Sequence, residues 1–399
     1  MAGLNETPRG SRIHIAFFGL RNAGKSTLVN AFTGQQIAIV SDVPGTTTDP
    51  VSKAMEILPL GPCLVTDTAG LDDEGELGEM RVEKSLKVLE TVDIAVWVAG
   101  ENEECRIKNE ELRKDKFLSV CRTRGVVVVE YRRGGSVEEL KKKIAAVKIE
   151  EKMPGLLDGL VKKGDRVLCV VPIDESAPKG RLILPQQQVI RECLDKGLVV
   201  TLCRPEELFD CSDCSIGGLR GRMLVVTDSQ AFGVVNDFVT RWNRTIEQSN
   251  NPNNRTIRLT SFSVLFARQK GDLQEFVKGL KAIGSLKDGD TVLVAEGCTH
   301  HRQCNDIGAV KIPKALERLS GRKLKFEFAS GTSFAIEHSN NRTIEQFSLV
   351  VHCGGCMLTR REMLRRIART KEAGVPIVNY GLVLAQASGI NIQSLIPDP

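Results

Sequence analysis

The sequence has no long apolar run. The longest runs, such as residues 125–129 and 347–351, have the length of a strand, which excludes a membrane-spanning helix. It also has no apolar signal core after its first charged residues, so we expect a cytoplasmic protein, or one of an organelle matrix if the source is eukaryotic. Lysine and arginine (55) barely exceed aspartate and glutamate (50), and this small excess argues against nucleic acid as a partner. We therefore expect a globular protein that binds neither a membrane nor a nucleic acid.

The composition is that of an ordinary folded chain. Hydrophobic residues make up 41% and charged residues 26% of the 399 positions, which excludes a disordered protein and predicts two or three domains. Without a secretory signal, the 12 cysteines are expected to be reduced thiols or metal ligands rather than disulfides. Four histidines lie in the last hundred residues: His300, His301, His338 and His352. Chemistry that uses thiolates and imidazoles is therefore expected in the C-terminal part.

Strand-like and helix-like patterns alternate along the chain in three blocks. The first block is predicted to hold strands 12–19, 63–66, 94–99 and 126–129 and helices 24–33, 77–90 and 137–147. The second is predicted to hold strands 166–172, 198–202 and 223–227 and helices 185–196 and 232–242. The third is predicted to hold strands 261–266, 291–296, 347–351 and 376–379 and helices 273–283 and 359–373. This alternation predicts an α/β chain of parallel sheets, with the polar run 248–255 as a linker.

A phosphate-binding motif follows the first predicted strand. Residues 19–26 read GLRNAGKS, a complete GxxxxGK[ST] between a predicted strand and a predicted helix. In such a loop the backbone N–H groups surround phosphate oxygens, Lys25 adds a positive charge and Ser26 is placed to bind Mg²⁺. The predicted nucleotide-binding residues are Gly19, Asn22, Ala23, Gly24, Lys25, Ser26, Thr27, Asp67 and Gly70.

Two further segments complete this nucleotide site. Asp67-Thr68-Ala69-Gly70 ends the second predicted strand, so Asp67 is expected near Mg²⁺ and the N–H of Gly70 near a γ-phosphate. Between the two motifs lies the threonine-rich segment 42–49, which resembles the first switch segment of translation-factor-class GTPases. Thr47 is the preferred third Mg²⁺ ligand beside Ser26 and Asp67, with Thr46 and Thr48 left open.

The first block resembles the potassium-activated GTPases of the tRNA-modification and ribosome-assembly group. The resemblance rests on Asn22, on PGTT at 44–47 and on DTAG at 67–70. It implies binding of GTP, Mg²⁺ and K⁺, with Asn22 helping to hold K⁺ where other GTPases place an arginine finger. The catalytic residues it implies are Lys25, Asn22, Thr47 and Gly70. The alternative for Asn22 is a loop residue that merely tolerates an unusual backbone conformation.

The guanine-reading motif NKxD is missing between residues 94 and 145. Where it is expected, the predicted strand runs into Glu130-Tyr131-Arg132-Arg133, and residues 134–140 resemble the last loop and helix of such a domain. We therefore expect a GTPase domain shortened by one strand and one helix, with weakened preference for guanine.

Cysteines and histidines gather after two strands of the third block. Cys298 and His300 follow one predicted strand, and His352, Cys353 and Cys356 follow another. Open α/β sheets build sites at these strand ends. Three thiolates suit an iron–sulfur cluster or a soft metal, and spacing alone leaves zinc an equal alternative. Cys304 and His301 lie near these residues in sequence and could compete as a fourth ligand. Cys211 and Cys214 are expected to form an exposed pair that binds nothing.

Over its whole length the chain resembles the FeFe-hydrogenase maturation GTPases. The resemblance rests on segments that include NETPRGSRIHIAFFGLRNAGKSTLVNAFTGQ, SDVPGTTTDP, PIDESAPKGRLILPQQQ, VVTDSQAF, LTSFSVLFARQKGDL, EGCTHH and DIGAVKIP, and on the pattern CxH…HCxxC. It implies a GTPase domain at 1–152, a dimerisation domain at 153–255 and a cluster-binding domain at 256–399. It also implies a 4Fe-4S cluster on Cys298, Cys353 and Cys356, with His300 or His352 as fourth ligand.

The same resemblance implies a function. The chain is expected to act as a homodimeric scaffold that accepts a diiron precursor made with two radical S-adenosylmethionine maturases. It would pass the diiron subcluster to apo FeFe-hydrogenase, with nucleotide hydrolysis controlling its partners. The alternative from the residues is a potassium-activated, RNA-associated GTPase with a C-terminal zinc site.

Overall fold

The computed structural model describes ten segments of the chain. They are residues 7–34, 51–72, 76–100, 104–148, 153–173, 182–208, 222–248, 257–297, 306–331 and 343–392. The chain divides into two compact units, Met1–Lys152 and Met153–Pro399, and each is described by itself.

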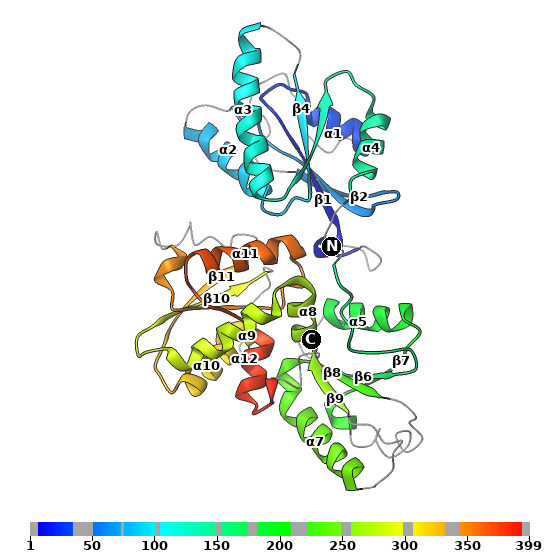
Figure 1. The fold of residues 1–399 in the computed structure, drawn as a ribbon, viewed down its shortest axis with the longest axis vertical. Coiled ribbons are helices and arrows are strands. Elements are labelled where there is room, and N and C mark those ends of the chain that lie inside the picture. The colour runs from blue at the N-terminus through cyan, green and yellow to red at the C-terminus, as the bar shows by residue number, and fades with distance from the viewer. Residues whose placement is uncertain are drawn as a thin grey trace. The chain divides into compact units, whose positions relative to one another are not determined.

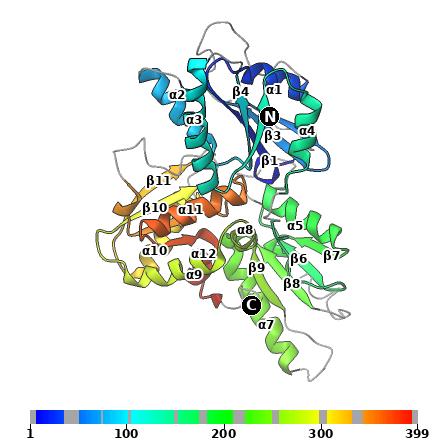
Figure 2. The ribbon, with the colours of Figure 1, turned by 45° about the horizontal axis from the view of Figure 1, so that its top comes forward.

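The first unit is a five-stranded sheet between two pairs of helices (Figure 1). Its strands are β1 (Ile13–Phe18), β2 (Val51–Ile57), β3 (Gly61–Asp67), β4 (Ile94–Ala99) and β5 (Val127–Arg132). Its helices are α1 (Lys25–Thr33), α2 (Glu76–Val88), α3 (Glu104–Thr123) and α4 (Val137–Ala145). The order is β2-β3-β1-β4-β5, with β2 antiparallel to β3 and every other pair parallel. The turned view confirms that α1 and α4 cover one face and α2 and α3 the other (Figure 2).

Strand β1 is buried on both faces because helices cover both. Ile15 and Phe17 pack with Phe32 of α1 on one side, whereas Phe18 packs with Phe117 of α3 on the other. A nearly continuous apolar sequence is typical of such a central parallel strand. The strand therefore holds the loop that follows it rigidly at the carboxyl end of the sheet.

Strand β5 is the last strand of this sheet in the part of the chain that the structure describes. It pairs directly with β4, and the helix that follows it, α4, contacts α1. Strand β4, which precedes the charged helix α3, is therefore the direct neighbour of the edge strand β5. Strand β2 and helix α3 were not predicted, because α3 is charged along much of its length and shows no apolar stripe.

The second unit holds two four-stranded sheets, both entirely parallel. The order β7-β6-β8-β9 is formed by β6 (Arg166–Val170), β7 (Val199–Cys203), β8 (Met223–Thr227) and β9 (Arg258–Ser261). The order β11-β10-β12-β13 is formed by β10 (Thr291–Glu296), β11 (Lys325–Ser330), β12 (Leu349–His352) and β13 (Ile377–Asn379). The helices are α5 (Leu184–Asp195), α7 (Phe232–Gln248), α8 (Phe262–Lys270), α9 (Leu273–Ala282), α10 (Ile312–Ser320), α11 (Arg360–Glu372) and α12 (Tyr380–Ala387). The predicted three-sheet α/β class is confirmed, and no helix among the described residues has the length and apolarity to cross a membrane.

The strand predicted at 261–266 is wrong, because this segment begins helix α8. The Ser261 hydroxyl oxygen accepts a hydrogen bond from the backbone N–H of Val264 at 3.2 Å and so caps the helix. Nearly every following side chain is buried, and a short apolar run buried on all sides does not reveal its period. The strand of this region is β9, which forms an edge of the second sheet. That sheet therefore continues past the domain boundary expected at residue 255.

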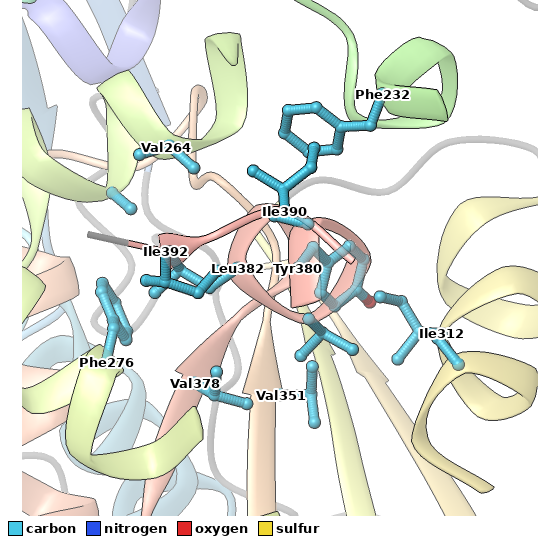
Figure 3. Packing of buried hydrophobic residues seen from close by; sticks show 14 of the residues in the cluster. Phe232, Val264, Phe276, Ile312, Val351, Val378, Tyr380, Leu382, Ile390 and Ile392 are labelled. Carbon is cyan, nitrogen blue, oxygen red and sulfur yellow. The ribbon is translucent and has the colours of Figure 1, made fainter. Parts of the chain in front are cut away.

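One apolar core joins the two sheets of the second unit. Phe232 of α7 and Val264 of α8 belong to the same buried cluster as Val351 of β12 and Val378 of β13. Figure 3 shows these side chains gathered around α12, with Tyr380 at its start. Both sheets and the connecting helix α8 therefore form one packed body.

Candidate nucleotide and cluster sites

The predicted phosphate loop lies between β1 and α1, and its backbone requires small or permissive residues. A Cβ atom on Gly19 would lie 2.5 Å from the carbonyl oxygen of Val98, so only glycine fits beside β4. Gly24, directly before α1, has φ +87°. Asn22 has φ +60°, a conformation that asparagine tolerates better than most residues. This backbone agrees with the alternative interpretation of Asn22 as a loop residue that tolerates an unusual backbone conformation.

Lys25 lies over this loop with its side chain largely buried. Its ammonium donates hydrogen bonds to the carbonyl oxygens of Leu20 at 2.7 Å and Gly19 at 3.3 Å. The loop thus holds the charged end of Lys25 close to its own backbone, where a phosphate would be bound. Ala23 is buried beside it, and Thr27 lies in the first turn of α1.

Ser26 and Asp67 lie together where Mg²⁺ is expected. The Ser26 hydroxyl donates to Asp67 Oδ2 at 2.6 Å, and Asp67 is fully buried at the end of β3. Its other oxygen, Oδ1, has no hydrogen-bond partner within the described segments. Burial raises the pKa of Asp67, while the Ser26 hydroxyl and the Lys25 charge oppose this shift. A buried carboxylate oxygen without a partner, beside a hydroxyl, fits Mg²⁺, which prefers oxygen ligands.

The segment after Asp67 lies directly against the phosphate loop. The N–H of Leu71 donates to the carbonyl oxygen of Gly19 at 3.2 Å, and a Cβ atom on Gly70 would lie 2.9 Å from the nitrogen of Arg21. Asp72 accepts a hydrogen bond from that same Arg21 N–H. Gly70 thus lies against the phosphate loop. The remaining predicted residue, Thr47, lies outside the described residues, as do Thr46 and Thr48.

The end of β5 brings an arginine beside the phosphate loop. The N–H of Arg133 donates to the carbonyl oxygen of Ala99 at 3.2 Å. Its side-chain Cδ and Nε atoms lie 3.8 Å from the position that a Cβ of Gly24 would take. The nearby carboxylate of Glu130 forms an ion pair with Lys114 at 2.8 Å. The sequence analysis did not assign Arg133 a role, because only the fold shows that it lies beside Gly24.

The two predicted cysteine loops leave neighbouring strands at one edge of the third sheet. Strands β10 and β12 are parallel, with Ala295 opposite His352. The N–H of Gly297, just after β10, donates to Cys353 Sγ at 3.2 Å, and the N–H of Gly355 donates to the same sulfur at 3.4 Å. The last described residue after β10 and the first residue after β12 are therefore in direct contact.

Other predicted residues of this site lie outside the described segments. They are Cys298, His300, His301 and Cys304, and Cys211 and Cys214 of the second block are also outside. Within the described part of the chain, no three metal-binding side chains lie together.

Cys353 and Cys356 lie in surroundings where the thiolate form requires a positive group beside it. Burial raises the pKa of Cys353 to about 11 and also raises the pKa of Cys356. These thiols therefore stay protonated at neutral pH unless a cation replaces the proton. The two N–H groups aimed at Cys353 Sγ are the kind of donor that tunes sulfur ligands of iron–sulfur clusters. The two described thiols and the N–H groups aimed at Cys353 Sγ are therefore compatible with ligands of a metal or a cluster.

His352 is fully buried, and both of its ring nitrogens are engaged. Nδ1 lies 2.8 Å from the carbonyl oxygen of Cys353 and must donate to it, so Nε2 accepts from Arg366 Nη1 at 2.9 Å. Burial, and then the Arg366 charge, lower the pKa of His352 to about 3, so the ring is neutral. No ring lone pair is left for iron, and this geometry argues against His352 as the fourth ligand.

Arg366 is a buried cation that the sequence analysis missed. Its guanidinium also donates to the Glu362 carboxylate at 2.9 Å and to the carbonyl oxygen of Gly331 at 2.9 Å. The sequence signal was the spacing of Glu362 and Arg366 by four residues on one helix. Such pairs are usually exposed, so burial could not be predicted from spacing.

Three family models match the chain one after another. A 50S ribosome-binding GTPase model matches residues 14–132. A hydrogen maturase F dimerization domain matches residues 156–271, and a hydrogen maturase F tetramerization domain matches residues 274–397. The matches cover both units.

Individual relatives match part of the chain. The tRNA modification GTPase MnmE of Methylobacterium sp. (strain 4-46) is 39% identical over 104 residues, which is 25% of this chain and 24% of that protein. The GTPase Der of Xylella fastidiosa (strain M23) is 37% identical over 145 residues, 34% of this chain and 31% of that protein. The chain thus spans about a quarter to a third of these relatives. The structure of Era from Aquifex aeolicus aligns over 79% of this chain and 93% of that one, with 16% identity and a TM-score of 0.26, and adds nothing to the assignment.

Proposed function

Because the chain belongs to the hydrogen maturase F family, we propose that it is a GTP-hydrolysing scaffold of FeFe-hydrogenase maturation. In this proposal it carries a 4Fe-4S cluster, accepts a diiron precursor as cargo and passes the diiron subcluster to apo-hydrogenase. Nucleotide hydrolysis in the first unit controls which partner is bound. The domains follow the expected order, with the middle domain extended through β9 into α8.

The nucleotide half of the proposal assigns roles to the residues around the phosphate loop. Lys25 binds the phosphates, Ser26 and Asp67 hold Mg²⁺ together with Thr47, and the N–H of Gly70 contacts the γ-phosphate. Mg²⁺, when bound, neutralises charge on the phosphates. The contact of the DTAG segment with Gly19 and Arg21 supports this, because a nucleotide bound at the loop would lie close to that segment.

Asn22 is proposed to hold K⁺ beside the phosphates. Its left-handed backbone does not compete with this role, since backbone conformation and a side-chain ligand are separate properties of one residue. Guanine preference is proposed to be weak, because the edge strand β5 ends in Tyr131-Arg132-Arg133 rather than in a base-reading aspartate.

The single observation that carries the cluster half is the meeting of two loops at Cys353. The N–H of Gly297, from the loop of Cys298, donates to the sulfur of Cys353, which begins the CxxC segment. We propose Cys298, Cys353 and Cys356 as the three fixed ligands. His300 is retained as the histidine candidate for the fourth position, and His352 is assigned to hold Cys353 in place.

The proposed assembly is a homo-oligomer. The dimerisation expected from the sequence is supported by the family match over 156–271, and the match over 274–397 supports a tetramer built from dimers. Apo FeFe-hydrogenase and two radical S-adenosylmethionine maturases are the proposed partners.

The experiment is metal and sulfide analysis of anaerobically purified, reconstituted protein, with activation of apo-hydrogenase measured in parallel. Wild-type protein should bind iron and sulfide in equal amounts and activate the hydrogenase. Cys298→Ser, Cys353→Ser and Cys356→Ser should each remove most of the iron and the activation. Cys304→Ser should keep both, as should the control Cys203→Ser, a change at the buried last residue of β7 in the second sheet.

Two results would contradict the proposal. Colourless wild-type protein that binds zinc and no sulfide would favour a zinc site and the RNA-associated alternative. Loss of iron in Cys304→Ser as complete as in Cys353→Ser would show four fixed thiolates and no exchangeable position for cargo.

A further inference from the structure

A lysine from the middle of the chain is buried beneath the CxxC loop. Lys270, the last residue of α8, has no exposed surface. Its ammonium donates to the carbonyl oxygens of Cys356 at 2.8 Å and Leu358 at 2.6 Å. The ring of Phe266, one turn earlier on α8, lies 5.5 Å from the ammonium. The backbone after Cys356 is thus folded around a positive charge.

This charge has no dedicated carboxylate among the described residues. Glu362, the carboxylate whose charge acts on Lys270, is itself paired with Arg366 at 2.9 Å. A buried ammonium held only by carbonyl dipoles and a ring is costly. Apolar residues such as methionine fill such positions without that cost, so the charge itself needs an explanation.

Besides Glu362, the groups near Lys270 that can become negative are the thiols of Cys356 and Cys353. Cys356 and Cys353 are both close enough to act electrostatically on the ammonium. A cluster bound by thiolates carries net negative charge, which increases on reduction. Burial lowers the pKa of Lys270 to about 8, so the ammonium is charged at neutral pH. This positive charge beside the cluster would favour binding and favour the reduced form.

Helix α8 also connects this loop to the start of the second unit. Gln269 donates to the carbonyl oxygen of Pro154 at 3.0 Å, and Arg268 donates to that of Leu156 at 3.1 Å. Lys270 therefore lies on a helix fixed at one side to residues 154–156 and at the other to the CxxC loop. Contacts outside the CxxC loop therefore contribute to its position.

We propose that Lys270 is a positioning residue of the cluster site: it holds the carbonyl oxygens of Cys356 and Leu358 and supplies the positive charge that compensates the cluster. The inference rests on the proposed cluster function. It adds that the middle domain, matched over 156–271, contributes a charge to a cluster whose ligands belong to the following domain. At an effective dielectric constant of about 20, a unit charge even about 12 Å away changes an equilibrium constant roughly tenfold.

The test compares full-length Lys270→Met, Lys270→Gln and Lys270→Arg with wild type after anaerobic reconstitution. Iron and sulfide per chain are measured first, and the midpoint potential of the cluster is then followed by electron paramagnetic resonance. Both neutral variants should lower the equilibrium constant for one-electron reduction on the order of tenfold, a shift of about 59 mV to more negative potential. Lys270→Arg should stay near the wild-type potential. The control is Lys278→Met, an exposed lysine on α9 paired with Glu275, which should change nothing.

The outcomes separate this inference from the proposed function. Wild-type protein without iron and sulfide would contradict the cluster itself. Wild-type potential in folded, iron-loaded Lys270→Met or Lys270→Gln would overturn the role of Lys270. If Lys270→Met fails to fold by circular dichroism, Lys270→Gln, a neutral side chain that keeps N–H donors, carries the same comparison against Lys270→Arg.

Discussion

Removing the guanidinium of Arg366 should destabilise the second unit strongly. The side chains of Arg366 and Glu362 are only 4% and 8% exposed and lie 2.9 Å apart. Breaking a buried pair by removing one partner costs about 3–5 kcal/mol, because the other charge stays buried. Arg366→Met also leaves Nε2 of His352 without its donor. Because this hydrogen bond belongs to the same network as the ion pair, the two losses of unfolding free energy are not simply additive. We expect the free energy of unfolding of the second unit to fall by about 3–5 kcal/mol in total.

The assay is urea unfolding followed by tryptophan fluorescence. The chain has two tryptophans, Trp97 in β4 of the first unit and Trp242 in α7 of the second. All variants therefore carry Trp97→Phe, so that Trp242 reports the second unit alone. Exposed Lys371 on the same helix, 3.5 Å from Glu275, gives the control Lys371→Met, for which about 0–1 kcal/mol is expected.

A double variant tests the reason for the loss. Replacing both members of a buried pair by apolar residues is often close to neutral, so Arg366→Met with Glu362→Met should recover much of the stability lost in Arg366→Met. An Arg366→Met protein within about 1 kcal/mol of the reference, with no recovery in the double variant, would refute the assignment of a buried, coupled pair.

Three further predictions concern the first unit. Lys25→Ala and Ser26→Ala should abolish hydrolysis measured by phosphate release and leave iron content unchanged, because the two sites lie in separate units; iron loss in folded protein would contradict this. Without a base-reading carboxylate, the preference for GTP over ATP in equilibrium binding should be smaller by about ten- to a hundredfold than in GTPases with NKxD; a strong preference in isolated protein would contradict this. Burial lowers the pKa of His14, so the unfolding free energy of the first unit should fall as pH drops below about 6.5, and His14→Gln should flatten this dependence measured with Trp97 fluorescence.

Much of the fold could be predicted from local sequence, and so could the phosphate loop of the nucleotide site and the CxxC loop of the cluster site. The phosphate loop is predictable because its chemistry fixes both residue types and spacing, and the structure places Gly19, Lys25, Ser26, Asp67 and Gly70 together. The loop that begins with Cys353 was predictable because it follows an apolar strand. Parallel neighbouring strands end at one edge of a sheet, so their loops meet.

The remaining features depend on tertiary packing. The apolar segment 261–266 has no period that separates a strand from a buried helix, and Ser261 decides the outcome by capping α8. Lys270 and Arg366 are single charged residues on helices, which in sequence indicate a solvated face. Only the packing of α8 and α11 against the CxxC loop shows that both cations are buried.

The apolar core that joins the second and third sheets limits how this chain can be divided. A cut between residues 271 and 274, where the two matched domains meet, would separate Phe232 and Val264 from Val351 and Val378. Each fragment would expose a large apolar face and aggregate. The CxxC loop is therefore part of the 153–399 body and not a separable module. Under the proposed function, a partner that receives cargo at this loop would have to dock against the surface of that intact body.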